Sequence, residues 1–253
     1  WDTQHIFGGI PMNNPAFSET LGDLRASQYT SLDIRNELRN NLIRDLSEGI
    51  ATFPNVIGYD DTVLPQLQHA ILSGHDILLL GERGQAKTRL LRSLTNLLDD
   101  YTPYIAGCDI YDDPFNPICR RCRDLVKEEG DQTKIDWLNR TERYTEKLAT
   151  PDVSMADLIG DIDPIKVAEG RYLSDDFTIH YGLIPRSNRG IFCINELPDL
   201  PERIQVGMFN LMEERDIQVK GYKIQLPLDI LVVATANPED YTNRGRIITP
   251  LKD

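Results

Sequence analysis

The chain has 253 residues, of which 40% are hydrophobic and 26% charged, a balance typical of a globular protein with one large domain or somewhat more. Its formal net charge of −13 argues against a general affinity for the nucleic-acid backbone, and no apolar run approaches the roughly 18 residues that a membrane span requires. The N-terminus has neither a basic segment nor an apolar one, so no signal peptide is expected. The four cysteines then suggest a reducing, cytoplasmic setting.

Residues 1–49 are expected to form a segment that precedes the main domain. Residues 1–16 contain Gly, Asn and Pro without periodicity, which is typical of an irregular lead-in. Apolar residues then recur at helical spacing from Ile34 to Leu46, and Gly49 marks the end of that pattern. We expect this amphipathic helix to pack against the body of the protein.

A short apolar loop, F-P-N-V-I-G-Y-D-D, occupies residues 53–61 and precedes a second helical pattern. It lies just upstream of the strongest motif in the chain. Val56, Ile57 and Gly58 are therefore predicted to form the shelf for the adenine ring of a nucleotide.

The strongest motif is G-E-R-G-Q-A-K-T at residues 81–88, which follows the apolar run at residues 77–80 and precedes a leucine-rich helical pattern. A buried strand, a glycine-bearing loop and a helix form the context of a phosphate-binding P-loop, in which backbone N–H groups surround phosphate oxygens. Lys87 supplies a charge for the β- and γ-phosphates, and the Thr88 hydroxyl can reach Mg²⁺. The predicted phosphate-binding residues are Gly81, Glu82, Arg83, Gly84, Gln85, Ala86, Lys87, Thr88 and Arg89.

One position departs from the P-loop pattern G-x-x-x-x-G-K-[ST]. Ala86 stands where the pattern has its second Gly. Alanine costs little there if its φ angle is negative, so Ala86 weakens the match without removing it, and the loop is still expected to bind nucleotide.

The segment at residues 108–150 interrupts the regular alternation of strands and helices and is predicted to be an insertion on the core. A short second strand is expected before it, at residues 104–107, and a charged helical stretch is expected around Trp137.

Three cysteines of this insertion have a spacing that raises the question of zinc. Cys119 and Cys122 have metal-ligand spacing, and Cys108 is a third potential ligand. A closed zinc site requires four ligands, and no fourth Cys or His lies nearby. Two interpretations remain open, a zinc site and three ordinary thiols, and the sequence favours the thiols.

A further apolar run at residues 191–194 ends in Asn195 and Glu196. P-loop ATPases place an acidic pair at such a strand end, one for Mg²⁺ and one to activate the attacking water. Glu196 keeps the activating carboxylate, whereas Asn195 offers Mg²⁺ an oxygen without a charge. Residues 229–234 predict another buried strand, and Asn237 beyond its end is placed to contact the γ-phosphate.

Two hairpins are predicted between these motifs. One spans residues 165–179 with a turn at Glu169-Gly170, and the other spans residues 217–226 with a turn at Lys220-Gly221.

In combination, these stretches closely resemble an AAA+ ATPase of the magnesium-chelatase/MoxR type, in the clade marked by a helix-2 insert, over roughly residues 50–253. Residues 81–88 resemble its Walker A motif, I-F-C-I-N-E its Walker B motif, T-A-N-P its sensor 1 and V-I-G-Y its adenine-side loop. D-L-I-G-D-I-D and Y-G-L-I-P-R-S-N-R-G are similar to the helix-2 insert, and residues 217–226 to the pre-sensor-1 hairpin.

The resemblance implies an α/β P-loop NTPase fold, with a parallel sheet flanked by helices and decorated by β-hairpin inserts. It also implies Mg²⁺-dependent ATP hydrolysis in a ring, usually a hexamer, with each nucleotide at a subunit interface. The work done would be metal insertion or complex maturation on a protein partner, often one with a von Willebrand factor A domain. The arginine finger and the lid domain would follow residue 253, so weak activity is expected of residues 1–253 alone; Arg244 and Arg246 do not match the finger position.

Two other functions stay open at this stage. Asn195 favours a nucleotide-dependent scaffold with little hydrolysis. A nucleic-acid motor would rely on Lys220 and Lys223 of the hairpin, but the net charge of −13 makes nucleic acid an unlikely partner.

Overall fold

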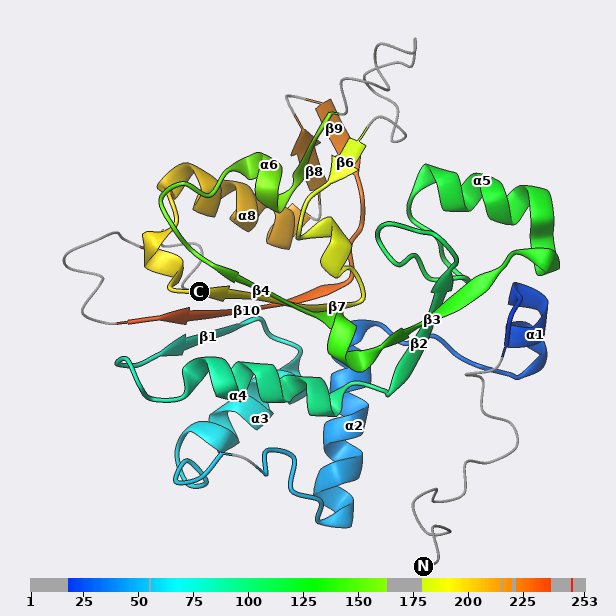
Figure 1. Cartoon of the computed structure of the whole chain (residues 1–253). Helices are drawn as coiled ribbons and strands as arrows, with labels where there is room; N and C mark the ends of the chain where they lie inside the picture. The colour runs from blue at the N-terminus through cyan, green and yellow to red at the C-terminus, as the bar shows by residue number, and fades with distance from the viewer. Residues whose placement is uncertain are drawn as a thin grey trace, which may run out of the picture.

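The computed structural model (Figure 1) describes residues 18–54, 56–162, 179–214, 216–219, 222–237 and 247. The predicted irregular lead-in, the turns at Glu169-Gly170 and Lys220-Gly221, and Arg244 and Arg246 lie outside these residues. No helix in the described ranges is long and apolar enough to cross a membrane.

The described residues form a central parallel sheet of four strands in the order β1-β10-β7-β4. The strands are β1 (Ile77–Leu80), β4 (Tyr144–Leu148), β7 (Gly190–Asn195) and β10 (Ile230–Ala236). Every residue of β7 is buried, because helices cover both faces of a parallel sheet and its inner strands become continuous apolar runs. The predicted α/β fold with a parallel core is therefore confirmed.

Helices pack on both faces of the sheet (Figure 1). One face is covered by α2 (Ile34–Glu48), α3 (Val63–Ser73) and α4 (Lys87–Ser93), and the other by α6 (Met155–Leu158) and α8 (Glu202–Glu214). Side chains alternate along β7, so Ile191 and Cys193 join the core with α2, α3 and α4. Phe192 and Ile194 join the core on the α8 side.

The predicted N-terminal helix is confirmed as α2. The Asp33 side chain accepts a hydrogen bond from the Asn36 N–H at its start, and Gly49 ends it with a φ of 69°. These are the expected side-chain cap and the left-handed glycine cap of a helix. The buried residues of α2 include Leu38 and Leu42, so the helix packs on the domain as expected.

A small lobe stands beside the sheet (Figure 1). It contains an antiparallel pair of strands with two helices, namely β2 (Tyr101–Ile105), β3 (Ile135–Asn139), α5 (Arg120–Glu129) and α1 (Leu21–Ala26). The strand expected at residues 104–107 corresponds to β2, which pairs with β3 and not with the central sheet.

Two expectations for the region 108–150 differ from the structure. Trp137 lies in β3 and not in a helix, because pairing with β2 imposes the extended conformation there. Near the end of the region, residues 144–148 form β4, an edge strand of the central sheet, so the part of the lobe that lies in this region ends before residue 144. An edge strand is only half covered, and the sequence Y-T-E-K-L therefore lacks the apolar run that marks β7.

A buried ion pair fixes the start of β4. The Arg143 Nη1 and Nη2 atoms donate to the two carboxylate oxygens of Glu37 in α2, each at 2.6 Å, and both residues are 4% exposed. Arg143 Nε also donates to the Arg189 carbonyl at 2.8 Å, just before β7. One side chain therefore ties helix α2 to two strands of the sheet.

Two hairpin-like pairs lie on the α8 side (Figure 1). β8 (Asp216–Val219) pairs antiparallel with β9 (Tyr222–Gln225), which confirms the predicted second hairpin. β5 (Gly160–Ile162) pairs with β6 (Ile179–Tyr181), whereas the hairpin predicted at residues 165–179 lies almost entirely outside the described residues.

Candidate nucleotide-binding and catalytic site

The loop between β1 and α4 holds the P-loop motif at the carboxyl edge of the sheet. Gly81 N–H donates to the Ala236 carbonyl at 3.2 Å, which extends the β1–β10 ladder into the loop. Gly84 has a φ of 84°, a conformation that glycine adopts without strain. The structure therefore places the motif where ligands bind open α/β sheets.

Ala86 does not have the negative φ at which alanine would cost little. Its φ is 56° and its ψ is 21°, in the left-handed region, at the residue immediately before α4. The chain must turn here from the loop into the helix, and the motif normally has Gly at this position for that reason. The left-handed conformation costs an L-residue about 1–2 kcal/mol, so this loop carries a local strain that glycine would lack.

The Lys87 ammonium lies folded over its own loop. Nζ donates to the Gly81 carbonyl at 2.5 Å and to the Glu82 carbonyl at 2.9 Å. Carbonyl oxygens are weaker partners for an ammonium than phosphate oxygens are. A bound phosphate could therefore replace them, and the charge is already held in the loop.

Thr88 and Asn195, the two predicted magnesium ligands, lie in contact. The Thr88 hydroxyl donates to Asn195 Oδ1 at 3.2 Å, and the Thr235 hydroxyl of β10 donates to the same oxygen at 3.2 Å. Asn195 is 8% exposed at the end of β7. The amide oxygen therefore faces the two hydroxyl groups, close to the start of α4.

Glu146 of β4 is a site residue that the sequence did not reveal. Its Oε1 accepts a hydrogen bond from Asn195 Nδ2 at 2.6 Å, and its Oε2 accepts one from Arg92 of α4 at 2.6 Å. An aspartate in place of Asn195 would put two carboxylates in contact, whereas the amide donates to Glu146. No motif marks Glu146, because only the pairing of β4 with β7 brings it to this site.

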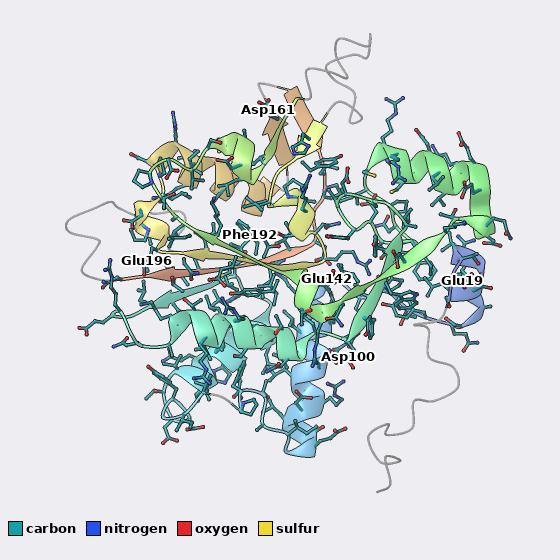
Figure 2. The ribbon with its side chains drawn as sticks, viewed as in Figure 1. Glu19, Asp100, Glu142, Asp161, Phe192 and Glu196 are labelled. Atoms are coloured by element: carbon teal, nitrogen blue, oxygen red, sulfur yellow. The ribbon has the colours of Figure 1, made fainter. Side chains whose placement is uncertain are left out.

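Glu196, the predicted activating carboxylate, follows β7 at the same edge of the sheet (Figure 2). It has a φ of 56°, and its N–H donates to the Thr235 hydroxyl at 3.1 Å. Its Oε2 is buried and has no hydrogen-bond partner among the described residues. Buried polar atoms without partners are uncommon in proteins, so this oxygen is poised to accept a hydrogen bond from a ligand or a water.

Asn237, the predicted γ-phosphate contact, directly follows β10 and is 4% exposed. Since Leu80 pairs with Ala236, Asn237 lies next to the start of the P-loop in the sheet. The structure therefore brings Asn237 to the edge that carries Lys87 and Glu196.

The adenine-side loop also lies against the P-loop. The Tyr59 hydroxyl donates to the Gln85 carbonyl at 3.1 Å, a contact that the sequence did not predict. Val56 is buried in the core, Ile57 is 88% exposed, and Gly58 has a φ of 85°. Of the three predicted shelf residues, Ile57 has the side chain that is free to cover a base.

The residues present fit a nucleotide with Mg²⁺. The Thr88 hydroxyl, the Asn195 amide and the carboxylates of Glu146 and Glu196 are hard oxygen groups, which Mg²⁺ prefers. Lys87 provides the positive charge that phosphates require.

Comparisons with known proteins also indicate similarity to nucleotide-dependent ATPases. Residues 169–248 match the family described as the Sigma-54 interaction domain. The magnesium-chelatase subunit ChlI homolog of Methanocaldococcus jannaschii is 28% identical over 176 residues, which cover 68% of this chain and 45% of that protein. The chloroplastic magnesium-chelatase subunit ChlI-2 of Arabidopsis thaliana is 23% identical over 218 residues, which cover 81% of this chain and 48% of that protein.

A solved structure of the magnesium-chelatase complex between subunits BchI and BchD has a similar fold, with a TM-score of 0.52 and 21% identity. The match covers 74% of this chain and 55% of that one. The chain spans about half the length of the curated relatives it matches. The predicted resemblance is therefore confirmed: in sequence and in fold, the chain is similar to AAA+ ATPases of the magnesium-chelatase type.

Proposed function

We propose that this chain binds ATP and hydrolyses it with Mg²⁺, as the catalytic core of a ring-forming AAA+ ATPase. The observation that carries the proposal is the contact between Thr88 and Asn195, two residues 107 positions apart that both belong to the predicted site. Glu196 lies at the same strand end, with a buried carboxylate oxygen that has no partner in the described part of the chain.

Each residue of the candidate site has a separate role in the proposed reaction. Lys87 exchanges its two loop carbonyls for the β- and γ-phosphates, and Asn237 contacts the γ-phosphate. Glu196 orients the attacking water and accepts its proton. Bound Mg²⁺, held by Thr88 and Asn195, would neutralise charge that develops on the phosphates.

Glu146 acts as a positioning residue in this scheme. Its carboxylate accepts a hydrogen bond from the Asn195 amide nitrogen, so the amide oxygen is directed toward Thr88. Arg92 balances the charge of Glu146 from α4. The amide at position 195 therefore keeps a fixed orientation although it lacks the charge of an aspartate.

We also propose that copies of the chain assemble into a ring, by analogy a hexamer, that acts on a protein partner. The similarity to magnesium-chelatase subunits supports this proposal, and the similar solved structure is a complex between two such subunits. The task would be metal insertion or complex maturation, with a partner that carries a von Willebrand factor A domain.

A second candidate is a nucleotide-dependent scaffold that turns over slowly. Asn195 favours it, because the amide supplies no charge to a metal ion and is already hydrogen-bonded to Thr88, Thr235 and Glu146.

Nucleotide binding is the first test. A fluorescent ATP analogue is titrated into the chain and into Lys87→Ala, with Lys127→Ala as the matched control, since Lys127 is exposed in α5. We expect Lys87→Ala to weaken binding at least about tenfold, because a charged hydrogen bond is worth about 1.5–3 kcal/mol, and Lys127→Ala to bind normally. Absence of ATP binding by the unaltered chain would overturn the proposal.

Phosphate release is the second test, measured over a range of protein concentrations so that assembly can occur. Glu196→Gln should bind ATP normally and lose at least about 100-fold in turnover, the contribution of a general base. Equal turnover in both proteins would exclude Glu196 from the chemistry. Tight binding with nucleotide-dependent assembly but no measurable turnover would favour the scaffold.

A further inference from the structure

The lobe beside the sheet contains a buried cluster that plays no part in the nucleotide site. Cys108, Asp112, Cys119 and Cys122 lie in or next to the loop that joins β2 to α5, and they are 5%, 0%, 6% and 0% exposed. Their sulfur atoms and one carboxylate oxygen all lie within 4.8 Å of one another. Four potential ligand atoms from one short segment therefore converge on a single point.

The separation of these atoms suits a small tetrahedral ion. Zinc–sulfur bonds of about 2.3 Å place the corners of a tetrahedron roughly 3.8 Å apart, within the spread of the cluster. Three thiolates and one carboxylate oxygen are ligands that zinc accepts, whereas magnesium and calcium prefer oxygen alone. The chemistry of the four groups therefore favours zinc.

Backbone N–H groups already point at two of the sulfurs. The Cys122 N–H donates to Cys119 Sγ at 3.4 Å, and the Asp112 N–H donates to Cys108 Sγ at 3.4 Å. Such hydrogen bonds stabilise thiolates, and they fix the direction of metal ligands.

A second observation that points to a bound cation comes from the hydrogen bonding of the Asp112 carboxylate. Its Oδ2 accepts a hydrogen bond from the Cys119 N–H at 2.9 Å, while its Oδ1 is buried and has no hydrogen-bond partner among the residues that the structure describes. A buried carboxylate oxygen without a partner is costly unless something binds it. A cation at the centre of the cluster would provide that partner.

We propose that Cys108, Asp112, Cys119 and Cys122 bind one Zn²⁺ ion in a structural site. Binding forms three Zn–S bonds and one Zn–O bond, and the thiol protons pass to solvent. Asp112 is the fourth ligand, which could not be identified from the sequence. One aspartate among many acidic residues has no spacing that marks it as a metal ligand.

The ion would add to the hydrogen bonds that already hold this loop. Between β2 and α5 the chain forms no regular helix or strand. The Asn188 amide donates to the Ile110 carbonyl at 3.0 Å, and Arg121 donates to the Gly107 carbonyl at 2.8 Å. Four metal bonds would join the end of β2 to the start of α5 and so fix the lobe.

Metal content tests the site directly and does not depend on ATP hydrolysis. The chain is purified under reducing conditions without added metal, and zinc is measured by mass spectrometry. We expect about one zinc per chain and less than about 0.1 in Cys119→Ser. Cys193→Ser is the matched control, because Cys193 is buried in β7 outside the cluster, and it should keep about one zinc. Equal zinc in the unaltered chain and in Cys119→Ser would overturn the proposal.

Cobalt provides a readout that does not rely on a variant that might unfold. The unaltered chain is stripped by a chelator and titrated with Co²⁺, and thiolate charge-transfer bands with tetrahedral d–d bands are expected at one equivalent. Asp112→Asn preserves the shape and removes the charge, so it should weaken Co²⁺ binding at least about tenfold while circular dichroism stays unchanged. The site is excluded if the reduced chain neither contains zinc nor gives these bands with Co²⁺.

Discussion

Replacing Asn195 by Asp restores the acidic residue usual at this position and tests its contact with Glu146. Asn195 Nδ2 lies 2.6 Å from Glu146 Oε1. Asparagine and aspartate side chains have the same shape. The substitution therefore places a carboxylate oxygen at the position from which the amide nitrogen of Asn195 now donates. A hydrogen bond becomes a contact between two negative charges.

The size of the effect follows from the geometry. Two unit charges whose centres are about 4 Å apart repel by about 4 kcal/mol at the effective dielectric constant of about 20 that suits partly buried sites. Glu146 is 26% exposed, and Arg92 lies 2.6 Å from its other oxygen, so part of this repulsion is offset. We expect Asn195→Asp to lower the free energy of unfolding by about 2–4 kcal/mol at pH 7 in the absence of Mg²⁺.

Urea denaturation with EDTA and with Mg²⁺ measures this loss. Added Mg²⁺ should recover most of it, because two carboxylates bind a divalent cation. The double variant Asn195→Asp/Glu146→Gln exchanges donor and acceptor, so it should return to within about 1 kcal/mol of the unaltered chain. If Asn195→Asp were as stable as the unaltered chain in EDTA, or the double variant no more stable than the single one, the assigned contact would be wrong.

Four further substitutions, one of them a control, test the fold by urea denaturation. Ala86→Gly should stabilise the chain by about 0.5–1 kcal/mol, since it relieves the left-handed strain at a φ of 56°, and a loss of stability would contradict that assignment. Glu37→Ala should destabilise the chain by about 3–5 kcal/mol, because Arg143 is left buried without its partner. Arg25→Ala is the control: it removes an exposed ion pair and should cost less than about 1 kcal/mol. Gly190→Ala should cost about 1–3 kcal/mol, because a Cβ there would lie 2.4 Å from the Arg143 carbonyl oxygen, and an unchanged stability would refute that contact.

The core strands could be predicted where both faces are buried. The inner strands β7 and β10 have continuous apolar runs, because helices cover both faces of the sheet there. β1 has an apolar run too, although it is an edge strand and Leu80 at its end is exposed. β4 has no such run, because its residues are half-buried or exposed, so its sequence does not separate it from the residues before it. β3 depends on distant pairing with β2, and local sequence does not encode a partner 30 or more residues away.

Some residues of the candidate site could be identified from the sequence, and others could not. Lys87, Thr88 and Glu196 follow from motifs, because their chemistry requires fixed spacing next to a strand. Glu146 and Thr235 reach Asn195 only through the register of β4, β7 and β10, which no short motif records. At Ala86 the motif and the residue type disagree, since the glycine of the motif suits a left-handed φ and alanine favours a negative one, and the structure follows the motif.

Strand β7 connects the proposed zinc site with the nucleotide site. Before the strand begins, Asn188 holds the Ile110 carbonyl of the cysteine-bearing loop. At the end of the strand, Asn195 contacts Thr88. The two contacts lie at opposite ends of one fully buried strand, and Figure 1 shows the lobe beside one end and the P-loop beside the other. Among the described residues, β7 between β4 and β10 is therefore one path by which the proposed metal-binding loop could affect the proposed nucleotide site.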